Sequence, residues 1–225
     1  MSEPLCLPDF MRPDVGCVVT SVWYLGSYER QRAAADAAIE AWKQLPWPEE
    51  CISNNCYLSP DGKLVWFYGQ WTSEEAHRAF SRTQRSLVAE AVDRAVSNVQ
   101  RMGVIRSRVQ RNMSQRRDIF PGCIILVTIA TDGPEHQLQV EQTIFSRIVR
   151  EGAPAHPGGV GGHLLFSNDG KRVLVYAEWT SEAAHRDALQ SGVLGGRGGI
   201  FEGMSGIEGI GFDRYHLYRR VERPR

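Results

Sequence analysis

Two stretches of this chain are nearly the same sequence. SPDGKLVWFYGQWTSEEAHRAF, which begins at Ser59, aligns without a gap with SNDGKRVLVYAEWTSEAAHRDA, which begins at Ser167, and 13 of the 22 aligned pairs are identical. Weaker similarity extends outward, and a polar, alternating segment closes each copy, VIRSRVQ at Val104 and GFDRYHLY at Gly211. Self-similarity of this kind predicts a tandem duplication, which constrains the fold more than any other feature of the chain.

The duplication divides the chain into two repeats. With 225 residues, the chain has room for two domains, each of about 100 residues. The segment NMSQRRDIFPG between the copies is short and charged, and it is predicted to be a connector. We therefore predict an N-terminal arm at 1–14, a first repeat at 15–111, a connector at 112–120 and a second repeat at 121–225.

Each repeat is predicted to contain a strand, a helix, two strands, a helix and a strand. The apolar runs Cys17–Tyr24 and Cys123–Ala130 are typical of strands covered on both faces. SYERQRAAADAAIEAWKQL and DGPEHQLQVEQTIFSRIV are predicted helices, the second with a proline suited to the first helical turn. SPDG and SNDG are turn sequences that join two strands into a hairpin. Thr-Ser-Glu after each tryptophan predicts a helix cap, with Thr72 and Glu75 as a capping box.

The βαββαβ order is that of a ferredoxin-like unit. Its sheet has one face covered by the unit's own helices, while the other face stays apolar. Two such sheets packed face to face would bury both bare faces. We therefore predict an α+β chain in which two tandem ferredoxin-like βαββαβ repeats form an intramolecular dimeric α/β barrel.

The second strand of each hairpin predicts a pocket between the sheet and the helices. Side chains alternate across a strand, so every second residue shares a face. The set that faces the helices is apolar, with a small residue beside the indole: Val65, Phe67, Gly69 and Trp71 in the first repeat, and Val173, Val175, Ala177 and Trp179 in the second. A small residue next to a large ring at a strand end favours a cavity. The alternative is that each tryptophan simply packs in the core.

A histidine follows each tryptophan by six residues. His77 and His185 lie one turn into the next predicted helix, where a neutral imidazole can accept a proton at physiological pH. The alternative is a partly exposed histidine on a capped helix. Asn55 in the first repeat corresponds to His163 in the second, and each is predicted to add one polar group to its pocket.

Composition and charge exclude several classes of partner. The 26 basic and 26 acidic residues balance, so no overall field attracts nucleic acid or an anionic membrane. No apolar run approaches the roughly 20 residues that a membrane helix needs, and MSEPLCLPDFMRPDVG has no signal-peptide pattern. The five cysteines form no CxxC pair and are predicted to be buried, reduced thiols. We expect a cytoplasmic protein that binds neither nucleic acid nor membrane.

The duplicated motif resembles that of the antibiotic biosynthesis monooxygenase family, and in particular that of the actinorhodin-type quinone-forming monooxygenases of aromatic polyketide pathways. The matching residues are Asp61, Gly62, Val65, Tyr68, Trp71, Ser73, Glu74, Ala76 and Arg78, and again Asp169, Gly170, Val173, Tyr176, Trp179, Ser181, Glu182, Ala184 and Arg186. TIATDGP at Thr128 is similar to the end of the family's first strand. The resemblance covers nearly the whole chain, twice.

This resemblance implies a family homodimer built within one polypeptide, with one pocket per repeat. Family members oxygenate electron-rich polycyclic phenols without flavin, haem or metal, because the deprotonated substrate itself reduces dioxygen. We therefore expect a cofactor-independent monooxygenase, with no metal ion, that uses dioxygen to convert a polycyclic phenol or anthrone-type polyketide to a quinone or hydroxylated product. The expected catalytic residues are Trp71, His77, Trp179 and His185, and the expected substrate-binding residues are Phe67, Gly69, Asn55, Val175, Ala177 and His163.

The sequence departs from the family's pattern at several positions. Phe67 and Val175 replace the family's asparagine four residues before the tryptophan, and histidines stand where the actinorhodin-type enzymes have a tyrosine. The arginine of the family's second helix has only the nearby candidates Arg94 and Arg197. Many glycines in the stretch 191–211 predict a more mobile wall in the second repeat. One repeat can therefore be the working site and the other its structural partner.

Three other functions are open at this point. A non-catalytic barrel that binds a polyketide intermediate, or steadies a biosynthetic complex, is favoured by the missing asparagines. A polyketide cyclase needs a general base, a role that His77 or His185 can fill. Haem degradation needs a proximal histidine and room for a porphyrin. Whether the chain pairs again as a homo-oligomer is also open.

Overall fold

The computed structural model describes residues 7–113, 116, 118–150, 156–192, 200–201 and 203–222, with the backbone alone for 147–150. It divides into two compact units. The first unit comprises Met1–Arg108 and Tyr215–Arg225, and the second comprises Val109–Arg214. The division falls inside two strands, β5 and β9, each of which begins in one unit and ends in the other.

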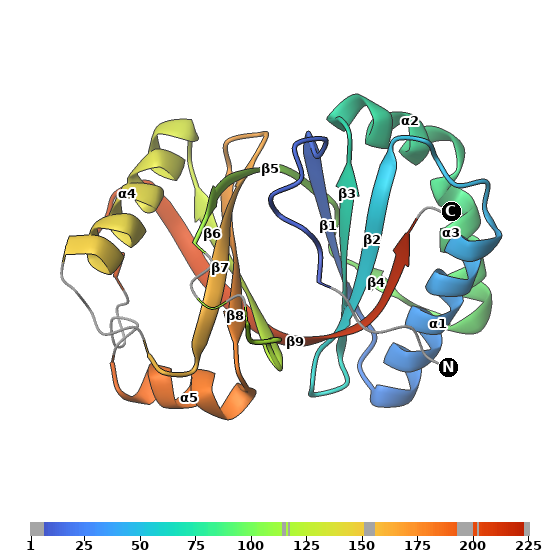
Figure 1. Cartoon of the computed structure of the whole chain (residues 1–225). Helices are drawn as coiled ribbons and strands as arrows, with labels where there is room; N and C mark the ends of the chain where they lie inside the picture. Colours follow the sequence, from blue (N-terminus) through green and yellow to red (C-terminus); the bar gives the residue numbers. More distant parts are fainter. Residues whose placement is uncertain are drawn as a thin grey trace. The chain divides into compact units, whose positions relative to one another are not determined.

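The first unit is an antiparallel sheet covered on one face by helices (Figure 1). β3 lies between β1 and β2, the end of β9 pairs with β2, and β4 and the start of β5 pair with β1. The elements are β1 (Cys17–Tyr24), α1 (Tyr28–Gln44), β2 (Cys51–Leu58), β3 (Leu64–Trp71), α2 (Glu74–Thr83), α3 (Arg85–Ala95), β4 (Gln100–Arg101), the start of β5 (Ile105–Asn112) and the end of β9 (Ile207–Glu222).

The second unit repeats this order, and its described residues form fewer elements. β8 lies between β6 and β7, in antiparallel register with both. In the strand order of the sheet, the start of β9 lies beside β6 and the end of β5 lies beside β7. Besides those two strand segments, the elements are β6 (Cys123–Thr131), α4 (Pro134–Arg150), β7 (Gly159–Ser167), β8 (Arg172–Trp179) and α5 (Glu182–Gln190).

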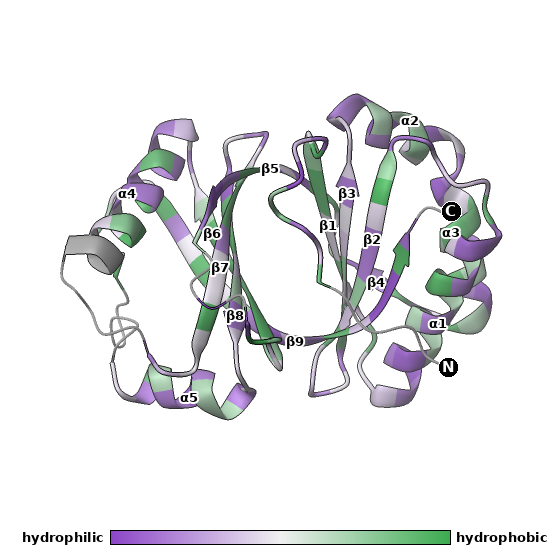
Figure 2. Cartoon of the chain, viewed as in Figure 1, coloured by the Kyte–Doolittle hydropathy of each residue, from purple (hydrophilic) through white to green (hydrophobic). Residues whose placement is uncertain are grey.

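Small side chains let α1 lie close to the first sheet. Ala34, Ala35 and Ala38 are fully buried and belong to the same core cluster as Val65 and Phe67 of β3. The opposite side of the helix is polar, so hydrophilic and hydrophobic residues alternate along it (Figure 2). The helix therefore forms because its alanine-rich face buries apolar area on the sheet while its polar face stays in water.

Each predicted hairpin turn is confirmed and is held by a glutamine that sequence analysis did not single out. In the first hairpin, Asp61 Oδ1 accepts a hydrogen bond of 2.6 Å from Ser59 Oγ. The buried Gln31 of α1 donates from Nε2 to the carbonyl oxygen of Ser59, at 3.0 Å. Asp169 and Gln137 make the same bonds, of 2.6 Å and 3.0 Å, in the second hairpin. These bonds fix each hairpin to the helix that precedes it.

The predicted capping box is wrong by one residue. The N-cap of α2 is Ser73, whose Oγ accepts a 3.1 Å hydrogen bond from the backbone N–H of Ala76. With Ser73 as the N-cap, the N3 position is Ala76 rather than Glu75, and alanine has no side-chain acceptor to complete a capping box. Ser181 caps α5 in the same way.

The predicted α+β ferredoxin-like order is confirmed in both repeats, and the first repeat contains α3 and β4 in addition. The predicted limits at 15–111 and 121–225 follow the order of the chain, whereas the compact units follow contacts between residues. The final strand of each repeat, β5 or β9, ends in the other unit. The tandem origin of the repeats and their closure into one barrel stay predictions.

Burial makes the described cysteines unreactive. Cys17, Cys51, Cys56 and Cys123 are buried thiols, as predicted, and Cys6 lies outside the described residues. Burial raises the pKa of Cys17 to about 11 and raises the pKa values of Cys51 and Cys56 further. A thiolate nucleophile at neutral pH is therefore disfavoured.

Among the described helices, none combines the length and the apolar character needed to cross a bilayer.

Candidate functional site

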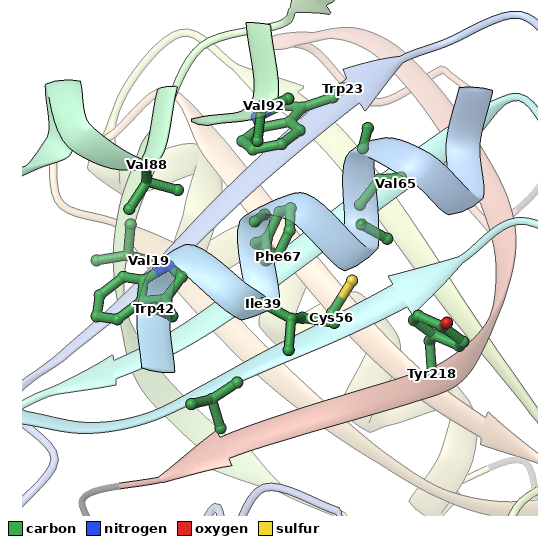
Figure 3. Close-up of a cluster of buried hydrophobic side chains, with 14 of the residues drawn as sticks. Val19, Trp23, Ile39, Trp42, Cys56, Val65, Phe67, Val88, Val92 and Tyr218 are labelled. Atoms are coloured by element: carbon green, nitrogen blue, oxygen red, sulfur yellow. The ribbon is translucent and has the colours of Figure 1, made fainter. Parts of the chain in front are cut away.

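A cavity of about 90 Å³ lies between the sheet and the helices of the first unit. Side chains of β1, β3, α1 and α3 meet around it, and Figure 3 shows several of them, including Trp23, Trp42, Phe67 and Val88. The first unit therefore contains the hollow that the small residue beside Trp71 predicted. The full lining is Val19, Ser21, Trp23, Ala38, Trp42, Asn54, Phe67, Gly69, Trp71, His77, Phe80, Arg85, Val88, Ala89, Arg101 and Val104.

Gly69 leaves the indole N–H of Trp71 uncovered. A Cβ atom on Gly69 would lie 3.1 Å from Trp71 Nε1 and 3.6 Å from Asn54 Oδ1. Among the described residues, no hydrogen-bond partner is present for this N–H, nor for that of Trp42, which also lines the cavity. The N–H of Trp23, in contrast, is bonded to Ser21 Oγ at 3.0 Å. Trp71 and Trp42 thus keep donors that a bound molecule can use.

The polar residue that β2 contributes is Asn54, not the predicted Asn55. Residues directly opposite on paired strands share a face, and Asn54 is opposite Gly69 while Asn55 is opposite Tyr68. Asn55 therefore points to the other face of the sheet, where its amide donates to the carbonyl of Tyr68, at 3.0 Å. The β-bulge between Cys51 and Ser53 shifts the register, so the alternation read from the strand's start fails. Asn54 supplies an amide close to Trp71 although Phe67 replaces the family's asparagine on β3.

His77 is held against the indole in a neutral form. Its ring lies edge-on to Trp71, with centroids 5.1 Å apart. Arg106 Nε donates to His77 Nδ1 at 3.0 Å, so the imidazole proton is assigned to Nε2. Burial, with the charges of Arg106 and Arg85, lowers the pKa of His77 to about 4. At neutral pH this histidine is thus a hydrogen-bond donor through Nε2 and a poor general base.

The second unit repeats the Trp–His–Arg group. The rings of Trp179 and His185 are 5.1 Å apart, and Arg214 Nε donates to His185 Nδ1 at 3.2 Å. Burial, with the charge of Arg214, lowers the pKa of His185 to about 4. Sequence analysis missed both arginines, although each lies 29 residues after its histidine. The equal spacing was the available signal.

Other parts of the second site differ from the first. In the second unit Gly162 is opposite Ala177, whereas at the equivalent place in the first unit Asn54 is opposite Gly69. The second unit therefore has no amide side chain at this position. His163 points to the other face, as Asn55 does, and bonds Asn112 Oδ1 at 2.9 Å. Val175 and Ala177 pack in the apolar clusters beside α4 and α5. Residues 193–199 and 202 of the glycine-rich wall predicted at 191–211 lie outside the described residues.

The cavity is lined by hydrogen-bond donors and positive charge. Arg85 and Arg101 contribute guanidinium groups, and no acidic side chain is present among the described lining residues. Arg94, a sequence candidate, is exposed and outside the lining, and Arg197 lies outside the described residues. An environment of this kind stabilises an anion and lowers the pKa of a bound phenol.

The described part of the chain holds one grouping suited to a metal ion, and it does not include any residue that lines the cavity. Asp132, Glu135 and His136 at the start of α4, in the second unit, place three ligand atoms within 4.8 Å of one another. Both carboxylates are exposed, and Asp132 already contacts the His136 ring. Nothing else points to a ligand there.

No protein-family model matches the chain, and no curated protein matches it. Among solved structures, an anthrone oxidase-like protein is similar, with a TM-score of 0.69 and 14% identity over 93% of this chain and 94% of that one. A candidate monooxygenase of Lactobacillus acidophilus NCFM has a TM-score of 0.53 and 9% identity over 92% and 96%. A major regulator of staphylococcal pathogenesis has a TM-score of 0.50 and 11% identity over 90% and 99%. The chain thus has a ferredoxin-like α+β fold that occurs in monooxygenase-like proteins and in a regulator.

Proposed function

We propose that the first-unit cavity binds an electron-rich phenol or anthrone-type compound as its anion, and that the chain catalyses its cofactor-independent oxygenation. The observation that carries this proposal is the pair of donors beside Gly69: the indole N–H of Trp71, which has no partner among the described residues, and the Nε2–H of His77, whose contact with Ser81 Oγ is long, at 3.5 Å. Donors aimed at a developing oxyanion are an effective means of lowering a barrier. The fold likeness to an anthrone oxidase-like protein supports the choice of substrate.

The reaction needs only the substrate and dioxygen. The bound phenol or anthrone loses its proton to solvent, because Trp71 and His77 stabilise the oxyanion. The anion transfers one electron to dioxygen, and the two radicals combine as a peroxide on the ring carbon. Loss of water then leaves a quinone, so that one dioxygen is consumed and one water is released for each anthrone. The protein's part is to bind the anion, exclude bulk water and admit dioxygen.

Assigning His77 as a donor replaces the general-base role expected from its position. Its Nδ1 lone pair is occupied by Arg106, and its pKa of about 4 leaves little driving force for accepting a proton at neutral pH. The same geometry weakens the cyclase alternative, which needs a base. An oxygenase does not need such a base when the cavity itself raises the acidity of the bound substrate.

The size of the cavity limits how the substrate enters. At about 90 Å³, it is smaller than a cavity of about 150 Å³ that holds benzene. The hydroxyl-bearing edge of the substrate can enter, while the other rings extend toward the mouth beside exposed Arg85. A porphyrin does not fit without rearrangement, which weakens the haem alternative.

Oxygen uptake tests this proposal. We expect the purified protein to consume dioxygen with anthrone or 1-naphthol at a rate at least about tenfold above the protein-free rate, with quinone absorbance rising in step. The rate should scale with protein concentration and survive dialysis against a metal chelator. Heat-denatured protein is the control for autoxidation. Uptake at the protein-free rate with every phenol tested would contradict the proposal.

A second candidate is a binding protein without turnover. Two observations favour it: the cavity has no general base, and the family's β3 asparagine is replaced by Phe67. That function would give saturable quenching of tryptophan fluorescence by 1-naphthol together with oxygen uptake at the protein-free rate. Fluorescence quenching and oxygen uptake, measured together, therefore distinguish the oxygenase from the binding protein.

A further inference from the structure

Positive charge near the mouth of the cavity is only partly balanced by acidic groups among the described residues. Arg85, at the first position of α3, makes no hydrogen bond or ion pair within the described part of the chain. Arg106 donates to the neutral His77. The neighbouring Arg78, in contrast, is paired with Glu74. Arg85 thus lacks a counter-ion among the described residues, while Arg106 shares the charge of Glu74 with Arg78.

Arg101 adds a donor that is fixed in place but unused. Its Nη2 bonds Asp93 Oδ1 at 2.8 Å, and its guanidinium lies 5.2 Å from the centroid of the Trp23 ring. These contacts hold the planar group against the cavity wall. Its Nε–H is buried and has no hydrogen-bond partner in the described residues. A buried donor without a partner favours an acceptor supplied by a ligand.

We infer that the ligand of this cavity carries a second anionic group, a carboxylate on its aromatic ring system, bound by Arg85 with support from Arg101. This inference rests on the proposed binding of a phenol in the same cavity. The hydroxyl end lies at Trp71 and His77, and the carboxylate lies at the mouth, where Arg85 is exposed. The substrate class is therefore a hydroxylated aromatic acid.

The chemistry of the lining favours a carboxylate over a neutral substituent. A guanidinium donates two parallel hydrogen bonds that match a carboxylate, and such charge-assisted bonds are stronger than neutral ones. An amide or ester at the same position would leave the charge of Arg85 without a counter-ion. The N-terminus of α3 adds to this preference, because it has no side-chain cap and no acidic residue in its first turn.

Matched acids and amides test the inference. We would measure binding under argon by tryptophan fluorescence, using 6-hydroxy-2-naphthoate against 6-hydroxy-2-naphthamide, and 4-hydroxybenzoate against 4-hydroxybenzamide. In the wild type, at least one acid is expected to bind about tenfold tighter than its amide. In Arg85→Gln this preference should fall below about threefold, and Arg85→Lys should restore part of it. Raising the salt concentration should weaken the binding of the acid and leave the binding of the amide unchanged.

Arg94→Gln is the matched control, because Arg94 belongs to the same helix, is exposed and does not line the cavity. Arg94→Gln should prefer the acid over the amide to the same degree as the wild type. Equal binding of acid and amide by the wild type, or an unchanged preference in Arg85→Gln, would overturn the inference. Neither result touches the proposed oxidation, which is measured separately with uncharged 1-naphthol. Preference for the acid without oxygen uptake would instead support the inference and contradict the oxygenase.

Discussion

Replacing Trp71 with phenylalanine is expected to lower kcat/KM for anthrone or 1-naphthol by about 100-fold, the cost typical of removing one oxyanion donor. The substitution keeps an aromatic ring against Trp42 and Phe80, whose centroids lie 6.5 Å and 5.2 Å from that of Trp71. It removes the indole N–H that no described residue occupies. Oxygen uptake over a range of substrate concentrations measures the loss.

The second unit supplies a matched control for this variant. Trp179 makes the same contact with His185 that Trp71 makes with His77, at 5.1 Å in both units. Trp179→Phe is expected to leave kcat/KM close to that of the wild type, because Trp179 belongs to the second unit and does not line the cavity of the first. Near-normal activity in Trp71→Phe would contradict the assignment of the first unit as the site. A lower kcat/KM in Trp179→Phe, with normal kcat/KM in Trp71→Phe, would assign the site to the second unit instead.

Lowering the pH from 7 to 4 is expected to destabilise the folded chain through His77 and His185. Their pKa values fall from 6.5 to about 4, so in this window the unfolded chain binds more protons than the folded one. Stability therefore rises with pH between about 4 and 6.5, and it is lost as the pH falls through that range. The difference corresponds to about 3 kcal/mol per histidine, a large share of the stability of a typical domain.

The double variant His77→Gln, His185→Gln tests this effect. Glutamine keeps an acceptor for the arginine but does not titrate, so the fall in the free energy of unfolding between pH 7 and 4 should be several kcal/mol smaller. Asp61 and Asp169, whose pKa values are lowered by bonds to Ser59 and Ser167, contribute equally to both proteins. His216→Gln, at an exposed position, is the control. Parallel pH profiles for wild type and double variant would show that neither histidine is buried as a neutral group.

Much of the fold follows from local sequence. The apolar runs, the alanine-rich helix and the SPDG and SNDG turns lie where their patterns predict them, because each depends on residues close in the chain. The division of β5 and β9 between the units could not be read in this way. Pairing of β9 with β2 joins residues such as Val221 and Asn54, whose partnership leaves no local pattern.

The candidate site was predictable on β3 and less so elsewhere. Strict alternation along β3 places Phe67, Gly69 and Trp71 on the cavity face, as predicted. On β2, the correspondence between the repeats paired Asn55 with His163, but the bulge between Cys51 and Ser53 places Asn54, not Asn55, in the lining. Arg106 was missed because its contact with His77 joins side chains 29 residues apart in the chain, and only the equal spacing of Arg214 and His185 signals it.

The most direct test of the anion-binding cavity is the absorption spectrum of bound 2-naphthol at pH 7.5, recorded under argon so that no oxidation occurs. Free naphthol is neutral at this pH, because a phenol has a pKa of about 10. We predict that the protein-bound fraction shows the naphtholate band, and that Trp71→Phe weakens it. Bound naphthol that keeps the spectrum of its neutral form would contradict the account, since the donors of Trp71 and His77 would then stabilise no anion.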